Sequence, residues 1–214
     1  MAVNALRSPS GSPSVVDIIE HRAATVCFDP SDRIGDDAIE RLAELAARAP
    51  SAFNLQNWRL HAVRSLDMKE RLRAAAFGQA KVAQAAVTFV VSGEIPTGEE
   101  LEERLQPAVA AGLLDAATAD GWAAMARALL QDPAKAREEA IRSATLLGAT
   151  LMFAAEGFGL ATAPMSGFDR EHVRNLLGLT QDVVPVLLLA VGSRSCGTPR
   201  QKPRRPVEDI LTLV

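Results

Sequence analysis

The sequence predicts an α+β fold in which helices flank a central sheet within one domain. Helical and strand patterns alternate only irregularly and the helices cluster in the middle of the chain, which favours α+β over a doubly wound sheet. The chain has 214 residues, 48% of them hydrophobic, enough for one domain with a substantial core. Neither an internal repeat nor a linker divides it. We therefore expect a flexible tail over residues 1–14 and a single domain over 15–214.

The first elements follow from local signals. Ser14 and Asp17 have the spacing of a capping box, which predicts a helix over 15–21. An extended or turn segment follows it, because Pro30 disfavours helix in the residue before it. Residues 36–48 place apolar side chains on one face, which predicts an amphipathic helix ended by proline.

The middle of the chain is read in the same way. Alternating apolar and polar side chains predict a strand beginning at Trp58, and Gly78 occupies a helix C-cap position. Pro107 and Gly112 are expected to break the helical pattern that follows. The elements predicted here are a helix over 67–76, a buried strand over 86–92, and helices over 99–105 and 115–130.

A long helix is predicted from Pro133, which a first turn tolerates, to Phe158, with Gly159 ending it. Its later half is apolar or small nearly all round, which is typical of a buried helix and favours a position between two subunits. The remaining elements are a helix capped by Asp169 that runs to Leu177, a strand over 185–192, and an extended or mixed segment over 207–214.

Composition excludes several classes of function. The net charge of −3 argues against a nucleic-acid surface, and no apolar run is long enough to span a membrane. The start of the chain lacks the apolar core of a signal peptide. Cys27 and Cys196 are far apart without CxxC spacing, so neither zinc nor a disulfide is supported and a reducing, cytoplasmic setting is expected. The three histidines have neither triad nor metal spacing, so no metal is expected.

Four segments carry possible chemistry. The first begins at Arg22, and the fourth is the basic run over 202–206; arginines there could pair bidentately with a phosphate, although each segment alone also fits a solvated surface. The third, over 157–169, contains Gly167, whose backbone could approach a ligand closely. The alternative for the third segment is a connector between two helices.

The second segment is a polar loop over residues 49–59. Its donors and acceptors lie between two aromatic side chains, which suits a flat heteroaromatic ligand. The alternative is that these residues bond their own backbone in turns. The polar residues are Ser51, Asn54, Gln56 and Asn57, flanked by Phe53 and Trp58.

In this order and spacing, the four segments resemble the nitroreductase family of FMN-dependent oxidoreductases. The loop A-P-S-A-F-N-L-Q-N-W-R is close to the family pattern A-P-S-S-x-N-x-Q-P-W-x, and Pro164–Asp169 resembles P-x-E-G-F-D. The resemblance implies a central mixed, mainly antiparallel sheet flanked by helices. It also implies a homodimer that exchanges its C-terminal strand and holds FMN in the interface, with a helical lid over about 94–140.

The resemblance also implies roles for individual residues. Arg22, Lys202 and Arg204 would hold the FMN phosphate, and Ser51 and Asn54 would reach the flavin from the partner subunit. Gln79 would lie near the ring or ribityl chain, and the turn over 164–167 would pass over the isoalloxazine with backbone N–H groups near N5. The complete set implied for the cofactor is Arg22, Ala23, Ala24, Val26, Pro50, Ser51, Ala52, Asn54, Gln79, Pro164, Met165, Ser166, Gly167, Lys202 and Arg204.

The sequence departs from the family pattern at four positions. Ala24 stands where Ser is frequent, and Val26 stands where a cation is common near flavin N1 and O2. The missing cation implies either a lower reduction potential or a substitute from elsewhere in the chain. Ser166 replaces a common Glu and Asn57 a common Pro, which affects substrate class and redox tuning.

The resulting hypothesis is ping-pong transfer of hydride from NAD(P)H through flavin N5 to a small electron-poor acceptor such as a nitroaromatic, quinone or enone. No protein side chain is expected to act as the catalytic group, because the cofactor carries the chemistry. The alternatives are other FMN chemistry on the same scaffold (dehalogenation or ring oxidation), a non-catalytic flavin-binding or regulatory protein, and a helical dimer without cofactor.

Overall fold

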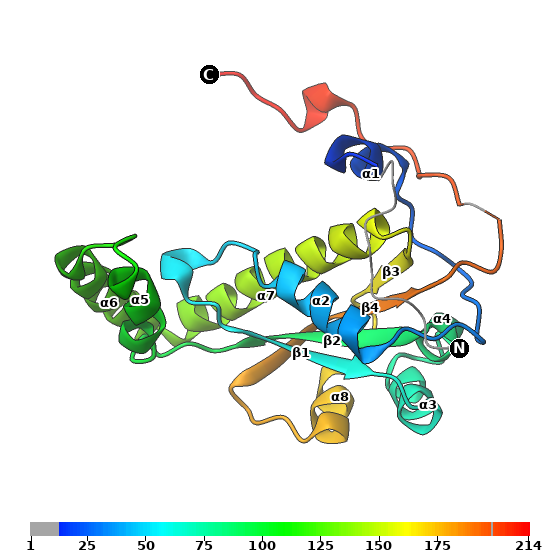
Figure 1. The fold of residues 1–214 in the computed structure, drawn as a ribbon, viewed down its shortest axis with the longest axis horizontal. Helices are drawn as coiled ribbons and strands as arrows, with labels where there is room; N and C mark the ends of the chain where they lie inside the picture. The colour runs from blue at the N-terminus through cyan, green and yellow to red at the C-terminus, as the bar shows by residue number, and fades with distance from the viewer. Residues whose placement is uncertain (1–12, 198) are drawn as a thin grey trace.

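The computed structural model describes residues 13–197 and 199–214. At its centre lies a four-stranded sheet in the order β1-β2-β4-β3, in which every pair of neighbours is antiparallel (Figure 1). The predicted α+β class is confirmed. The strands are β1 (Trp58–Val63), β2 (Val87–Glu94), β3 (Ala161–Met165) and β4 (Val183–Gly192).

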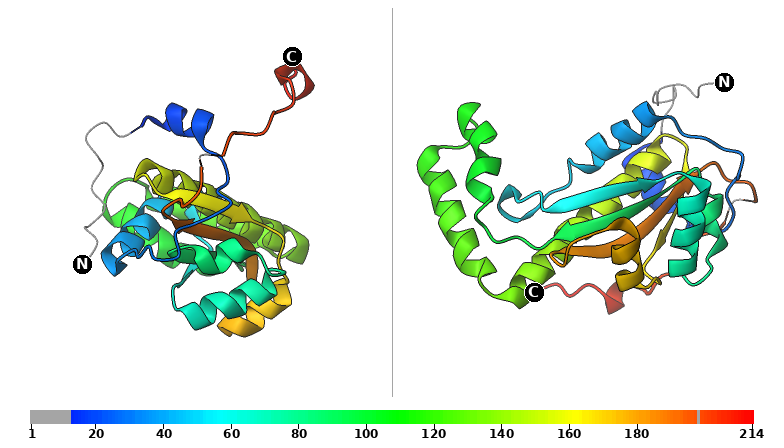
Figure 2. Two further views of the ribbon diagram at one scale, coloured as in Figure 1. Left: turned by 90° about the vertical axis from the view of Figure 1, so that its right-hand side faces the viewer. Right: turned by 90° about the horizontal axis from the view of Figure 1, so that it is seen from below.

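Helices cover both faces of this sheet, so a core forms on each side (Figures 1 and 2). Neighbouring side chains of β2 and β4 alternate between the cores: Val90 and Leu188 face α3 and α8, whereas Phe89 and Leu189 face α2 and α7. The helices are α1 (Val15–His21), α2 (Asp36–Ala46), α3 (Leu66–Ala75), α4 (Ala80–Gln84), α5 (Leu101–Ala110), α6 (Ala116–Leu130), α7 (Pro133–Gly157) and α8 (Arg170–Leu177).

The long helix α7 lies unusually close to the sheet. A Cβ on Gly93 of β2 would lie 2.1 Å from the carbonyl oxygen of Ala140, and a Cβ on Gly148 would lie 2.9 Å from Leu187 of β4. Gly148 therefore serves the packing of this helix on its own sheet.

Caps and periodicities placed most elements correctly. Ser14 and Asp17 form the predicted capping box of α1, and the side chain of Asp169 accepts from the backbone N–H of His172 at the start of α8. Phe158 caps α7, and Gly159 follows with φ 77°. Residues 1–12 of the predicted tail lie outside the described residues.

Three secondary-structure predictions were incomplete or wrong. The small-residue stretch after α7 was expected to connect two helices, but it forms the edge strand β3, paired with β4 from Ala161↔Gly192 to Met165↔Leu188. The short helix α4 was not predicted. Pro107 lies inside α5 instead of ending a helix, because a proline removes only its own N–H and its carbonyl still accepts from Ala111.

The prediction that the cysteines are unpaired is wrong. Cys27 and Cys196 form a disulfide across 169 positions of sequence. Spacing could not reveal it, because the fold brings the two segments together through an isolated bridge between Phe28 and Arg194. Within the described residues, no helix is both long and apolar enough to cross a bilayer.

Candidate functional site

A cavity of about 350 Å³ lies between the segment after α1 and the segment after β4. Among the described residues that line it, five are cationic and none carries a carboxylate. We call it the basic pocket. Its lining consists of Arg22, Ala23, Ala24, Thr25, Val26, Lys81, Pro199, Arg200, Gln201, Lys202 and Arg204.

The fold thus brings together both basic segments that the sequence singled out. Arg22 is separated from Lys202 and Arg204 by nearly the whole chain, yet all three line the same cavity. We call the segment after α1 (residues 22–26) the first wall of the pocket and the segment after β4 (residues 199–204) the second wall. Gln201 joins the two walls directly, since its Nε2 donates to the backbone oxygen of Ile19 at 2.7 Å and to that of Arg22 at 2.9 Å.

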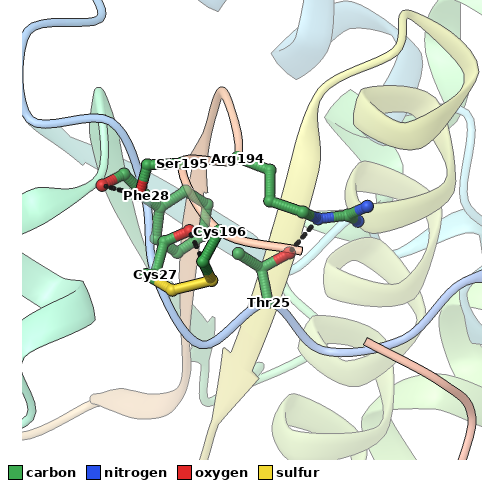
Figure 3. Close-up of a disulfide and its surroundings, with 6 residues drawn as sticks. All are labelled: Thr25, Cys27, Phe28, Arg194, Ser195 and Cys196. Atoms are coloured by element: carbon green, nitrogen blue, oxygen red, sulfur yellow. Dashed lines mark hydrogen bonds between the residues drawn. A yellow bond between two sulfur atoms is a disulfide. The ribbon is translucent and has the colours of Figure 1, made fainter. Parts of the chain in front are cut away.

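The first wall is anchored to the sheet at Thr25. Its backbone N–H donates to Thr162 of β3 at 2.8 Å, and Arg194 Nε donates to its hydroxyl at 3.4 Å (Figure 3). Thr25 is fully buried whereas Val26 is exposed. Because Thr25 is held in this way, residues 22–26 line one side of the cavity.

The disulfide lies where the two walls leave the sheet. In Figure 3, Cys27 and Cys196 lie beside Ser195, whose hydroxyl donates to the Phe28 carbonyl at 2.9 Å. Cys27 directly follows the pocket residue Val26, and Cys196 precedes the pocket residue Pro199.

Arg22 lies between two different environments. Its Nη1 atom is buried and has no hydrogen-bond partner among the described residues. Besides the basic pocket, it lines a second cavity with Glu156 and Arg194. Burial raises the pKa of Glu156, against the opposing effects of a hydrogen bond from Thr162 and the positive charges of Arg22 and Arg194.

Sequence reasoning missed Lys81, which α4 places in the basic pocket together with Val26. Burial lowers the pKa of Lys81. Its only signal in the sequence is its position two residues after Gln79. Arg200 and Gln201 were also missed, although they lie next to the predicted basic pair.

The turn after β3 contacts Gln79, the residue that caps α4. Gln79 Nε2 donates to the Gly167 carbonyl at 2.9 Å, and Ser166 and Gly167 are exposed. Met165 differs, because its side chain is buried in the core on the α3 and α8 face. Pro164 is half-buried on the edge strand β3.

The polar loop lies at the opposite end of the sheet from the basic pocket, so one chain does not bring the two together (Figures 1 and 2). Pro50 and Asn54 are exposed, whereas Ser51 and Ala52 are partly buried. Phe53 contacts Trp122 of α6 edge to face, with ring centroids 6.4 Å apart.

Two polar groups of this loop have structural partners. The Ser51 hydroxyl accepts from the Gln56 backbone at 2.9 Å, and Asn57, fully buried, donates through Nδ2 to the Glu94 carbonyl at 2.9 Å. The turn alternative applies to Ser51, whereas Asn57 bonds the backbone of the neighbouring strand β2. Phe53, Asn54 and Gln56 all have positive φ, and such backbone strain in non-glycine residues is concentrated at functional sites.

Comparison with known proteins agrees with the fold. A model of the nitroreductase family matches residues 19–193. A Thermus thermophilus protein named NADH dehydrogenase is 38% identical over 75% of this chain and 78% of its own. A Bacillus subtilis protein named as a candidate NAD(P)H nitroreductase is 30% identical over 83% and 87%.

A solved structure has the same fold. It is described as a candidate nitroreductase from Exiguobacterium sibiricum in complex with FMN, and it superposes with a TM-score of 0.86 at 24% identity over 94% of this chain and 98% of that one. Since the family model spans all four strands of the sheet and both of its helical layers, the chain belongs to the nitroreductase family.

Proposed function

We propose that this chain is an FMN-dependent oxidoreductase that takes electrons from NAD(P)H and passes them to a small electron-poor acceptor in alternating half-reactions. The observation that carries the proposal is the basic pocket, in which two distant segments and α4 together bring five cations to one cavity. The names of the Thermus and Bacillus relatives favour a nicotinamide reductant. FMN in a structure of the same fold favours the cofactor.

The pocket suits the phosphate of FMN. A phosphomonoester carries about −1.5 to −2 charges at neutral pH and is recognised by several cations and N–H donors. A phosphate oxygen would also give the buried Nη1 of Arg22 the partner it lacks among the described residues. We assign Arg22, Lys202 and Arg204 to the phosphate.

Lys81 supplies the positive charge that Val26 does not. Both residues line the basic pocket, and a half-buried ammonium there would favour the anionic reduced flavin. Of the two consequences open for Val26, we therefore favour a substitute cation over a lowered potential.

FMN bound in this pocket would supply the hydride chemistry at its N5 atom. The chain's own residues bind and orient the ring. Gln79 fixes the Gly167 carbonyl, which positions the exposed turn over 166–167 where its backbone N–H groups could face the flavin. No side chain needs to act as a general base.

A second copy would complete the site. The C-terminal segment leaves the body of the molecule, and its apolar side chains are exposed: Val207 by 62%, Ile210 by 68% and Leu213 by 87% (Figures 1 and 2). An unpartnered apolar segment of this kind is typical of an interface. We propose that it packs on the partner, which in return brings Ser51 and Asn54 to the flavin, with α5 and α6 as the lid. Static light scattering tests this, and a monomer would contradict it.

The decisive experiment begins with protein purified without added cofactor. Visible absorbance with flavin bands and release of FMN, identified by mass, are expected. Anaerobic NADH or NADPH should bleach the bands, and a quinone or nitroaromatic should restore them over many turnovers. Bands that NAD(P)H never bleaches would favour the non-catalytic flavin protein. Protein that neither contains nor takes up FMN would favour the helical dimer without cofactor.

A charge-matched pair of variants tests the phosphate assignment. Arg22→Ala combined with Arg204→Ala should release FMN, since each charge-assisted hydrogen bond contributes about 1.5–3 kcal/mol. Arg41→Ala combined with Arg170→Ala removes two exposed cations outside the pocket lining and should retain the cofactor. Equal FMN occupancy in both double variants would refute the assignment. Substrate screens with the reduced protein separate reduction of nitroaromatics, quinones and enones from dehalogenation or ring oxidation.

A further inference from the structure

We propose that the disulfide between Cys27 and Cys196 is a thiol–disulfide exchange site, acted on by a small or protein dithiol, and that its oxidation state controls how tightly the basic pocket holds a phosphate-bearing cofactor. The proposal rests on the proposed function, because it takes FMN as the ligand of the pocket. It adds a covalent control of the cofactor through cysteines that the phosphate assignment does not use.

Position is the first argument. The disulfide links the two walls of the basic pocket at their origin, since Cys27 follows Val26 and Cys196 precedes Pro199. The cross-link therefore restrains the two walls at their base, on the chain segments that lead to Arg22 on one side and to Lys202 and Arg204 on the other. Four of the five cations of the pocket come from these two segments, so the pocket depends on how the two segments are held.

Second, few hydrogen bonds besides the disulfide hold the second wall in place. The backbone of β4 pairs with neighbouring strands as far as Gly192. The backbone hydrogen bonds that follow along the chain end at Ser195, whose N–H donates to the Cys27 carbonyl at 3.3 Å. Beyond Cys196, the described residues up to 206 form no helix or strand. Among these residues, Gln201 provides the hydrogen bonds that hold the second wall to the backbone of Ile19 and Arg22.

Without the covalent link, the second wall would be held at its base by Ser195, which bonds to Cys27 and Phe28, and beyond Cys196 by the side-chain amide of Gln201. Its cations would sample more conformations before binding, and ordering them again would cost binding free energy. The oxidised protein is preorganised for the phosphate, whereas the reduced protein is not.

Accessibility is the third argument. Both cysteines are half-buried, unlike the residues of the two cores, so an attacking thiolate can approach. One thiolate of the dithiol attacks a sulfur of the disulfide, giving a mixed disulfide and one cysteine thiolate. The second thiolate of the reductant then displaces the other cysteine. Two electrons and two protons pass from the dithiol to Cys27 and Cys196, and the reductant leaves as its own disulfide.

Linkage makes the coupling measurable from both directions. If oxidation strengthens FMN binding by some factor, bound FMN must make the disulfide harder to reduce by the same factor. A disulfide that is merely present near the pocket would not show this reciprocity.

The experiment compares the full chain in its oxidised form and after treatment with dithiothreitol in the dark. Alkylation with iodoacetamide and mass spectrometry should find two thiols after reduction and none before it. Apoprotein is then titrated with FMN by flavin fluorescence. We expect the Kd for FMN to rise about tenfold on reduction, the scale set by freeing one or two ordered side chains, and to return on reoxidation.

The double variant Cys27→Ser with Cys196→Ser is the matched control. Its Kd should equal that of the reduced protein and should not respond to dithiothreitol. In addition, saturating FMN should shift the dithiothreitol concentration that half-reduces the native protein by the same factor. Should the variant fail to fold, reduction and reoxidation of the native chain still decide the matter.

The outcomes distinguish failure of the exchange site from failure of the proposed function. Equal Kd values for oxidised and reduced protein, with FMN still bound, would overturn the exchange site and leave the proposed function intact. Absence of FMN binding in either form would overturn both. A loss of affinity that persists after reoxidation would also contradict a reversible site.

Discussion

Thr162 donates a hydrogen bond from its hydroxyl to Glu156 Oε1 at 2.5 Å, which joins the last turn of α7 to β3. Glu156 lines a cavity with Arg22 and Arg194, so a carboxyl group lies on the side of Arg22 away from the basic pocket. This contact connects the packing of the sheet to the charges around Arg22, which also lines the basic pocket.

We expect Glu156 to make the stability of the apoprotein pH-dependent. Burial raises its pKa in the folded state, so the folded protein binds the proton more tightly than the unfolded chain does. This contribution to stability is fully present below the ordinary glutamate pKa and is lost as pH rises through the raised pKa. Urea unfolding at a series of pH values should show that decline.

Glu156→Gln should remove this part of the pH dependence. Glu138→Gln, at an exposed site on the same helix, should keep the native profile. Identical slopes for the native chain and Glu156→Gln across the range would contradict the assignment.

Lys81 should make FMN binding sensitive to alkaline pH. Because burial lowers its pKa, its charge is lost at a lower pH than that of an exposed lysine, and affinity for the phosphate-bearing flavin should fall in that range. Lys81→Met should weaken binding about tenfold or more at neutral pH, the size of a charge-assisted hydrogen bond, and flatten the alkaline decline. Lys135→Met on an exposed turn of α7 is the control. Unchanged affinity in Lys81→Met would exclude Lys81 from the site.

Gln201 should matter for affinity without contributing charge. Its amide bonds to two backbone oxygens of the first wall, so Gln201→Ala should loosen the pocket and raise the Kd for FMN roughly five- to tenfold, the effect of about one to two hydrogen bonds. Gln106→Ala, exposed on α5, should leave the Kd unchanged. Fluorescence titration measures both, and equal values would mean that the wall is positioned by other contacts.

Gly93 should be the least replaceable glycine of the sheet. A Cβ there would lie 2.1 Å from the Ala140 carbonyl oxygen, so Gly93→Ala must push α7 away from β2. We expect a loss of about 3 kcal/mol or more in the free energy of unfolding. Gly121→Ala, in the interior of α6 with open space around its Cβ, should instead stabilise by about 0.5–1 kcal/mol. Thermal or urea unfolding distinguishes the two, and similar stabilities would refute the close-packing argument.

The sequence by itself determined most of the local elements and the family. Helix boundaries follow from short-range contacts such as the Ser14 and Asp17 capping box, the first-turn position of Pro133 and the cap of Asp169, all readable from neighbouring residues. The motifs around Arg22 and in the polar loop were sufficient to indicate the nitroreductase family, which the family model confirms.

Other features were decided only by the tertiary structure. Residues 161–165 form a strand because β4 offers them a partner, although their small side chains and Pro164 resemble a turn. Asn57 serves the backbone of Glu94 because the sheet buries it. Lys81 joins the basic pocket because α4 lies beside the first wall, and Cys27 meets Cys196 because the bridge between Phe28 and Arg194 aligns their segments. Each of these depends on contacts between distant parts of the chain, whereas residue patterns report mainly on contacts within a few positions.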